Sequence, residues 1–324
     1  MKKIVFKCND IKIGINSNND ELIYDLIKKY GDYFNLTNDS ADFNISYLVY
    51  ENPIPLGTEF KEINETEYNY VAHKDDNLYV FMKDYNKTKE DFVKRIFTNY
   101  YIKILQKNGF IIIHGACVSK NDEAIILSGN KRCGKTTTLI NLLDRGYDFI
   151  ANDRIAVKKI NDEFIVQGIP FSMGIILEDA LKYPGFDIKN KKIEIDGEKK
   201  KVYVETSDIS KMFDVYSKSS GVVKSIIVPK YNQNIENINI LRIDDCVSTL
   251  GNNIMFDNAL PEDKQFMNEL IKIKYQNPSV LNGISTFSVE QSANTFDELN
   301  EFIKNNIISR KGKKYKYDLW FAHS

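Results

Sequence analysis

The chain has 324 residues, of which 43% are hydrophobic and 27% charged, and its formal net charge is −1. This balance predicts a soluble globular protein and excludes a general electrostatic attraction to nucleic acid or to an anionic membrane. The length exceeds that of a usual single core, so we expect two domains.

The cysteines and the apolar runs indicate where in the cell the protein is expected. The widely separated Cys8, Cys117, Cys133 and Cys246 lack the paired spacing of a zinc site. No apolar run approaches the roughly 20 residues of a membrane span, and the first residues lack the apolar stretch of an export signal. We therefore expect a cytoplasmic protein with reduced thiols. No repeat and no basic patch with interleaved aromatics favours nucleic acid as a partner.

Residues 1–88 predict a small α+β domain. Apolar alternation predicts strands within 3–15, 43–50, 68–72 and 78–82. Apolar residues at helical spacing predict a helix over 21–34 and a long helix over 89–107, whose broad apolar stripe is most simply core. We place the second domain at 89–324.

A phosphate-binding motif follows two predicted strands, 110–114 and 116–119, and a buried one, 124–128. Gly129-Asn130-Lys131-Arg132-Cys133-Gly134-Lys135-Thr136 fits G-x-x-x-x-G-K-[ST], the loop that wraps the phosphates of a nucleotide. Helical spacing over 137–143 completes the strand, loop and helix order that the motif requires.

Each residue type in the motif has a physical role. Gly129 and Gly134 permit backbone angles and a close approach that a Cβ would forbid, so N–H groups can point at oxyanions. Lys135 would reach the β- and γ-phosphates, and the Thr136 hydroxyl would bind Mg²⁺. We predict ATP or another nucleoside triphosphate, with Mg²⁺, at Gly129, Asn130, Lys131, Arg132, Cys133, Gly134, Lys135, Thr136 and Thr137.

The next predicted strand, 147–151, delivers Asn152, Asp153 and Arg154 at its end. Ligands collect at the carboxyl ends of strands, and an acidic residue there can hold Mg²⁺ or orient a nucleophile. Asp153 is therefore a candidate metal ligand or base, and a plain turn carboxylate is the alternative.

The remaining sequence predicts structure more than chemistry. We expect hairpins at 154–167 and 192–205, a buried strand at 222–229, and amphipathic helices at 261–276 and 295–305. The cluster Lys199, Lys200 and Lys201 could meet phosphate or an acidic peptide, but a solvated hairpin arm is the simpler interpretation.

Four elements in order resemble the catalytic core of the HPr kinase/phosphorylase family and its smaller bacterial relatives: His114-Gly115, the phosphate loop, Arg145-Gly146 and Asn152-Asp153. The resemblance implies an α/β fold with a mixed sheet, a P-loop core related to phosphoenolpyruvate carboxykinases. It also implies transfer of the γ-phosphoryl group of ATP to a serine hydroxyl, on the protein HPr or on a precursor peptide.

By position in the family's motifs, the resemblance implies that Lys135 supplies positive charge and Thr136 binds Mg²⁺. It also implies that His114 lines the site and that Asp153 is the second residue of the family's paired acidic motif. The first acidic position, usually the general base, is Asn152 here, and an amide has no useful basicity. Three hypotheses stay open: Asp153 does both jobs, His114 accepts the proton, or the protein binds nucleotide and transfers slowly or not at all. We expect an active kinase, because positioning and electrostatics dominate phosphoryl transfer.

The phosphoryl acceptor stays open between a protein, a peptide and a small hydroxyl compound. The C-terminal signature that helps the family form a hexamer is not identifiable, so a homo-oligomer also stays open. A nucleotide-binding regulatory module is the second function class. A GTPase or motor is disfavoured because no N-K-x-D base-reading motif is present.

Overall fold

The structure is a computed structural model that describes residues 1–31, 33–50, 61–66, 69–74, 77–189, 191–197, 199–255 and 276–308. The chain divides into two compact units. The described part of the first lies within Met1–Gly109, and that of the second within Phe110–Phe256 and Gln276–Lys316. The helix predicted at 261–276 lies, apart from Gln276, outside the described residues.

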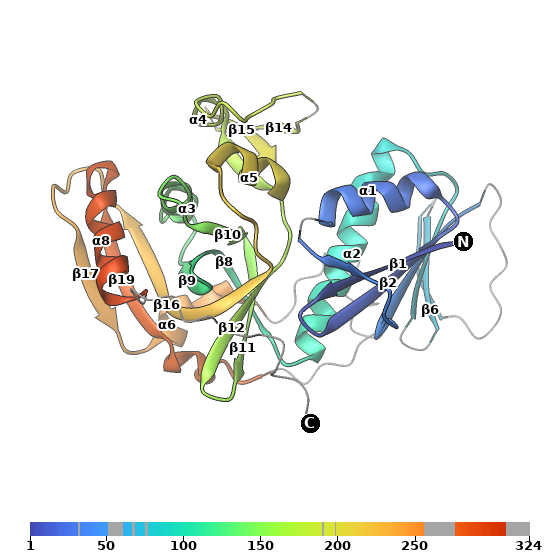
Figure 1. Ribbon diagram of the computed structural model, residues 1–324, viewed down its shortest axis with the longest axis horizontal. Helices are drawn as coiled ribbons and strands as arrows, with labels where there is room; N and C mark the ends of the chain where they lie inside the picture. Colours follow the sequence, from blue (N-terminus) through green and yellow to red (C-terminus); the bar gives the residue numbers. More distant parts are fainter. Residues whose placement is uncertain are drawn as a thin grey trace. The chain divides into compact units, whose positions relative to one another are not determined.

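The described residues of the first unit form a seven-stranded sheet and two helices (Figure 1). Its elements are β1 (Lys2–Cys8), β2 (Ile11–Ser17), α1 (Asp20–Tyr30), β3 (Asn35–Thr37), β4 (Phe43–Val49), β5 (Lys61–Thr66), β6 (Asn69–Lys74), β7 (Asn77–Met82) and α2 (Lys87–Lys107). The strand order is β3-β1-β2-β4-β7-β6-β5, in which β4 runs parallel to β2 and β7. The strands and helices predicted for this part of the chain are confirmed.

Helix α2 packs on the N-terminal strands. The Phe97 ring lies 6.0 Å from the Phe6 ring, 4.6 Å from Tyr30 and 5.8 Å from Phe34, measured between centroids. Burying such a ring stabilises the fold by roughly 1.5–3 kcal/mol. The compact units therefore divide after Gly109, with α2 in the first, whereas the sequence placed the boundary between residues 88 and 89.

The second unit contains the phosphate-loop sequence. Its elements are β8 (Ile111–Lys120), β9 (Glu123–Ser128), α3 (Lys135–Leu143), β10 (Asp148–Ala151), β11 (Arg154–Ile160), β12 (Glu163–Gly168), β13 (Met173–Ile176), α4 (Leu177–Ala180), β14 (Ile193–Asp196), β15 (Lys199–Val204), α5 (Thr206–Phe213), β16 (Ser220–Tyr231), β17 (Asn239–Ile243), α6 (Cys246–Leu250), η1 (Gly251–Asn253), β18 (Ile254–Met255), η2 (Pro278–Gly283), β19 (Ser285–Gln291), η3 (Ala293–Thr295) and α8 (Phe296–Asn306). Within the described residues, no helix of either unit is long and apolar enough to span a membrane.

Nine strands of this unit form one mixed sheet. Strand β9 lies between β8, which is antiparallel to it, and β16, which is parallel to it, and β19 runs parallel to β16. The pairings β8–β11, β11–β12 and β12–β16 complete a closed ring of strands. The predicted α/β class with a mixed sheet is confirmed. Strands β13, β15 and β14 form a separate antiparallel sheet.

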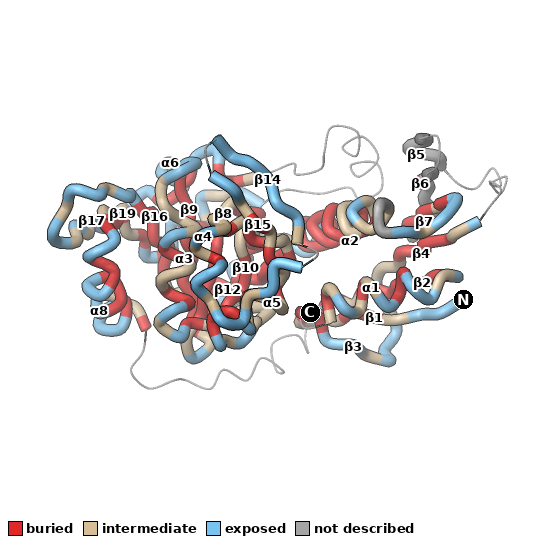
Figure 2. The backbone as a smooth tube through the Cα atoms, turned by 90° about the horizontal axis from the view of Figure 1, so that it is seen from above, coloured by how far each residue is buried: buried red, intermediate tan, exposed pale blue. Residues whose placement is uncertain are grey.

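Alternating side chains of β9 pack into two hydrophobic cores, one on each face of the sheet. Ile125 and Leu127 pack on the face that α3, α8 and the small sheet cover, whereas Ala124 and Ile126 pack on the other face, with residues of α6 and η2. The strand is buried along its whole length, as Figure 2 shows in red. The loop that follows β9 is therefore carried by a strand fixed on both faces.

One prediction for this unit needs correction. The two strands predicted at 110–114 and 116–119 are a single strand, β8, because Gly115 continues the pairing with β9 where a Cβ would lie 2.7 Å from the Leu127 carbonyl oxygen. The predicted hairpins, β11 with β12 and β14 with β15, are confirmed, as are the strand within β16 and the helix α8.

Candidate functional site

The loop between β9 and α3 has a backbone that depends on glycine. Gly129 has φ of 151° and Gly134 has φ of 105°, and Arg132 is also left-handed at 67°. A Cβ at position 129 would lie 3.1 Å from Cys133 Sγ and 3.2 Å from Val228 Cγ1. The two glycines of the motif thus stand where side chains would collide or strain the chain.

Helix α3 begins at Lys135, directly after the loop. Its N-cap is Gly134, which supplies no side-chain cap. The first N–H groups of a helix have no intrahelical partners, and the helix dipole is positive at this end. The loop and helix together therefore form an arrangement suited to an anion such as phosphate.

The Lys135 side chain folds back over the loop. Its Nζ donates hydrogen bonds to the carbonyl oxygens of Gly129 at 2.8 Å and Asn130 at 3.0 Å. Both partners are neutral, and an ammonium group bonds more strongly to an anionic oxygen. A bound phosphate would therefore compete well for this lysine.

On the β8 side of the loop, the structure brings His114 and Asp153 together. Arg154, the first residue of β11, pairs with His114 across the sheet, and Asp153 immediately precedes it. His114 Nδ1 lies 3.4 Å from Asp153 Oδ1. Asp153 has a left-handed φ of 73°, and its carbonyl oxygen accepts a bond of 3.0 Å from the Gly115 N–H. Backbone contacts thus fix the turn that presents the carboxylate.

The pair is linked to the loop strand and to neighbouring cations. Ser128, the last residue of β9, donates from Oγ to the His114 carbonyl oxygen at 2.8 Å. The Arg154 Nε lies 3.6 Å from Asp153 Oδ2, and the Arg154 guanidinium lies 4.8 Å from the centre of the Phe171 ring. Burial lowers the pKa of Arg154 from its usual value.

Burial lowers the pKa of His114. The positive charges of Lys135 and Arg154 act in the same direction, while the Asp153 carboxylate opposes them. An imidazole with a pKa below the usual value of about 6.5 is neutral at neutral pH. A neutral imidazole that faces a carboxylate through Nδ1 donates there and keeps Nε2 as an acceptor.

Asn152 begins the turn between β10 and β11. It is half-buried, and its carbonyl oxygen accepts a hydrogen bond of 2.9 Å from the Arg154 N–H. The amide side chain therefore stands directly before the carboxylate of Asp153 in the chain, at the place where the sequence resemblance leads one to expect an acid.

On the β16 side, the loop contacts residues that sequence reasoning missed. The Tyr231 N–H donates to the Cys133 carbonyl oxygen at 3.1 Å, and a Cβ at Gly134 would lie 3.3 Å from Tyr231 Cβ. Gln291, at the end of β19, is fully buried and donates from Nε2 to Thr138 Oγ1 in the first turn of α3. The one available signal was the apolar run of β16, which indicates a buried strand but not what it lies beside.

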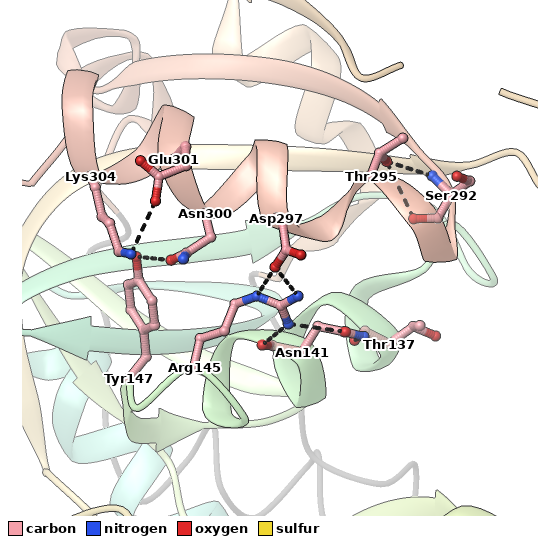
Figure 3. A network of polar contacts seen from close by, with 10 residues as sticks. All are labelled: Thr137, Asn141, Arg145, Tyr147, Ser292, Thr295, Asp297, Asn300, Glu301 and Lys304. Atoms are coloured by element: carbon pink, nitrogen blue, oxygen red, sulfur yellow. Dashed lines mark hydrogen bonds and ion pairs between the residues drawn. The ribbon is translucent and has the colours of Figure 1, made fainter. Parts of the chain in front are cut away.

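The far end of α3 is fixed to the C-terminal helix α8 (Figure 3). Arg145 donates to Asp297 Oδ1 from Nη2 at 2.6 Å and from Nε at 3.2 Å, and to the Asn141 carbonyl oxygen from Nη1 at 2.9 Å. Tyr147 Oη donates to Asn300 Oδ1 at 3.1 Å. Arg145, which belongs to the sequence resemblance, therefore holds α3 against α8.

The lysine cluster of β15 lies on a hairpin arm that is close to the loop. Lys199 and Lys200 are exposed, and Lys201 forms an ion pair of 2.5 Å with Asp196. The Lys201 ammonium lowers the pKa of Asp196, and the charges of Arg132 and Lys131 in the loop add to this effect. The lysine-bearing end of the arm is solvated, as predicted, whereas Val202 and Val204 of β15 are buried in the core.

The candidate metal ligands are Thr136 and Asp153. A hydroxyl and a carboxylate are hard oxygen donors, the type that Mg²⁺ prefers, so the residues fit this ion. Among the described residues there is no group of three or more His, Cys, Asp or Glu side chains that could hold a metal ion.

The site consists of strand β9, a glycine loop and helix α3, and the Asp153 carboxylate and the His114 imidazole lie on the β8 side. This arrangement has the architecture of a P-loop core. Over 128 residues the chain is 23% identical to the HPr kinase/phosphorylase of Lachnoclostridium phytofermentans, a match that covers 40% of this chain. The predicted resemblance to the HPr kinase/phosphorylase family is confirmed by this match.

The extent of each match is limited in a different way. The chain covers 37% of the length of that relative. The structure of the HPr(Ser) kinase/phosphatase from Coxiella burnetii matches 60% of this chain and 94% of its own, with 13% sequence identity and a TM-score of 0.30. No protein-family model matches the chain.

Proposed function

We propose that the protein is a kinase that uses ATP and Mg²⁺ to transfer the γ-phosphoryl group to a hydroxyl, most simply a serine of a protein or a precursor peptide. The observation that carries the proposal is the meeting of two features on neighbouring strands. The lysine-bearing loop follows β9, and the His114–Asp153 pair lies on β8 and at the start of β11, with Ser128 bonded to His114.

Binding falls to the loop and the start of α3. Backbone N–H groups of the loop and of the first turn of α3, together with the helix dipole, would face the phosphates, and Lys135 would exchange its two carbonyl partners for phosphate oxygens. Thr136 and Asp153 would hold Mg²⁺, which neutralises phosphate charge when bound. The ammonium of Lys135 stabilises the charge on the transferring group.

In this proposal, a member of the His114–Asp153 pair accepts the proton of the acceptor hydroxyl. Asn152 cannot accept it, because an amide is not basic near neutral pH. Either the Asp153 carboxylate takes the proton directly, or His114 takes it at Nε2 while Asp153 holds Nδ1 at 3.4 Å. Both routes need the Asp153 carboxylate.

A second candidate is a nucleotide-binding regulatory module with weak or no transfer, and Asn152 is the observation that favours it. A kinase for a small hydroxyl-bearing metabolite is the third, because the loop and the His114–Asp153 pair do not specify the acceptor.

Mass spectrometry after incubation with ATP and Mg²⁺ tests the proposal against HPr, serine-containing precursor peptides and free L-serine. We expect a gain of one phosphate on an acceptor, lost in Lys135→Ala and kept in the control Lys211→Ala, whose exposed lysine lies in α5, outside the phosphate loop. ATP binding without transfer to any acceptor would favour the regulatory module. Failure to bind ATP would reject the nucleotide site.

A further inference from the structure

The two neighbours of β9 give the phosphate loop two different flanks. On the β8 flank stand His114 and Asp153, and on the β16 flank stand Tyr231 and, beyond it, Gln291. In the proposed reaction the γ-phosphate must lie beside the His114–Asp153 pair. Because the loop holds the phosphate chain, the nucleoside then leaves the loop on the β16 flank.

Residues of two strands can meet a nucleoside there. Strands β16 and β19 run parallel to β9, so their carboxyl ends lie at the same edge as the loop, where ligands collect. Glu290 accepts a hydrogen bond of 2.7 Å from the Asn232 side chain, and Gln291 is fully buried. Tyr231, which pairs with Gln291, is 46% exposed and carries an aromatic ring.

Tyr231 is fixed against the loop rather than loosely placed on the surface. Its N–H bonds to the Cys133 carbonyl oxygen at 3.1 Å, and a Cβ added at Gly134 would lie only 3.3 Å from Tyr231 Cβ. Ile227 packs into the core beneath α3, and side chains two and four positions along a strand share a face. Tyr231 therefore lies on the α3 face, beside the helix N-terminus.

We propose that the Tyr231 ring is the platform on which the base of the bound nucleotide stacks. This inference rests on the proposed nucleotide site and adds the position of the base. An aromatic side chain serves any base, because every base has a π face, so the platform fits the absence of an N-K-x-D motif. Tyr216, a more exposed tyrosine of the same unit, is instead bonded through its carbonyl oxygen to the Phe149 N–H of β10.

Isothermal titration calorimetry with two probes separates the contribution of the base to the binding affinity from that of the phosphates. One probe is ATP with Mg²⁺, and the other is inorganic tripolyphosphate with Mg²⁺, which has no base. The variants are Tyr231→Leu, which keeps apolar bulk against Gly134, and Tyr231→Phe, which keeps the ring. Tyr216→Leu is the matched control, because this tyrosine is 78% exposed in the same unit.

We expect Tyr231→Leu to bind ATP about ten-fold more weakly, the scale of one lost stacking contact, and to bind tripolyphosphate as the wild type does. Tyr231→Phe and Tyr216→Leu should match the wild type within two-fold for both probes. Circular dichroism checks that each variant is folded, and if Tyr231→Leu is not, Tyr231→Met carries the same test.

Three results would overturn the inference. Wild-type ATP affinity in Tyr231→Leu would show that the ring does not meet the base. An equal loss for ATP and tripolyphosphate would show that Tyr231 shapes the loop instead. If the wild-type protein bound neither probe, the nucleotide site itself would be rejected, and this result is distinct from the other two.

Discussion

The two flanks of the phosphate loop differ in the kind of residue that they carry. The β8 flank holds groups that gain or lose protons or hold metal, His114 and Asp153, and these two residues meet through their side chains. The β16 flank holds Tyr231 and Gln291, which are neutral, and Tyr231 is fixed by its backbone. A site of this kind separates phosphoryl chemistry from recognition of the rest of the nucleotide.

The difference also explains how each flank is held. Asp153 adopts a left-handed φ of 73°, a conformation uncommon for a residue with a side chain, and the Gly115 N–H fixes its carbonyl. The β16 flank needs no such strain, because β16 simply continues past the end of β9 to Tyr231. A left-handed residue with a side chain thus lies where we place the chemistry, although the turn residues Asn121 and Asp122 share this conformation.

The largest effect should come from the β8 flank. We expect Asp153→Asn to lower the rate of phosphoryl transfer by roughly 10²–10⁴, the range of a lost general base, and to change tripolyphosphate affinity far less. Initial rates from phosphoacceptor mass spectrometry give the measurement. Asp162→Asn, in the exposed turn after β11, is the control and should be unchanged. A transfer rate in Asp153→Asn within three-fold of wild type would contradict the assignment.

The centre of the loop should affect both flanks. Gly134 has φ of 105° and lies against Tyr231, so we expect Gly134→Ala to weaken ATP and tripolyphosphate binding together, by more than about ten-fold. Gly146→Ala is a matched control: Gly146 also has a positive φ, 74°, but a Cβ there meets nothing within 4 Å. Calorimetry should show weaker binding of both ligands in Gly134→Ala and wild-type binding in Gly146→Ala. Equal affinities in the two variants would contradict the loop geometry.

Restoring the acid at position 152 sharpens the comparison within the β8 flank. If the wild-type site lacks a base, Asn152→Asp should raise the transfer rate by about ten-fold or more. A fall in rate would mean that Asn152 already works in a different geometry with His114 and Asp153. Asn152→Ala serves as the control for loss of the amide, and the acceptor identified by mass spectrometry serves as substrate.

The smallest effect should come from the anchor between α3 and α8, which belongs to neither flank. The Arg145–Asp297 pair lies at the surface, and the Asp297 side chain is 89% exposed. We expect Arg145→Ala to lower the free energy of unfolding by about 1 kcal/mol or less and to leave the transfer rate within two-fold. Urea unfolding measures the first effect. A ten-fold loss of transfer would assign Arg145 a role in the reaction.

Local patterns in the sequence predicted the elements but not all of their partners. The loop, the hairpins and α8 were predictable because turns and apolar periodicity are encoded over a few residues. Sequence also singled out His114 and Asp153, although each separately. Their pairing depends on the antiparallel register of β8 and β11, which places Arg154 opposite His114.

The β16 flank lay outside the reach of such patterns. Gln291 meets Thr138 across 153 positions of the chain, and Tyr231 meets Cys133 through its backbone, which leaves no mark on residue choice. The place of α2 in the first compact unit lay outside the reach of such patterns for a similar reason. The apolar stripe of α2 predicts burial but does not say that Phe97 packs against Phe6, Tyr30 and Phe34.

The central claim is the direction in which the nucleotide lies across the loop. A crystal structure of the protein with a non-hydrolysable ATP analogue and Mg²⁺ tests it most directly. We predict that the γ-phosphate contacts Lys135 on the side of Asp153 and that the base lies on the Tyr231 ring. A base beside His114 and Asp153, with the γ-phosphate toward Tyr231, would contradict the account.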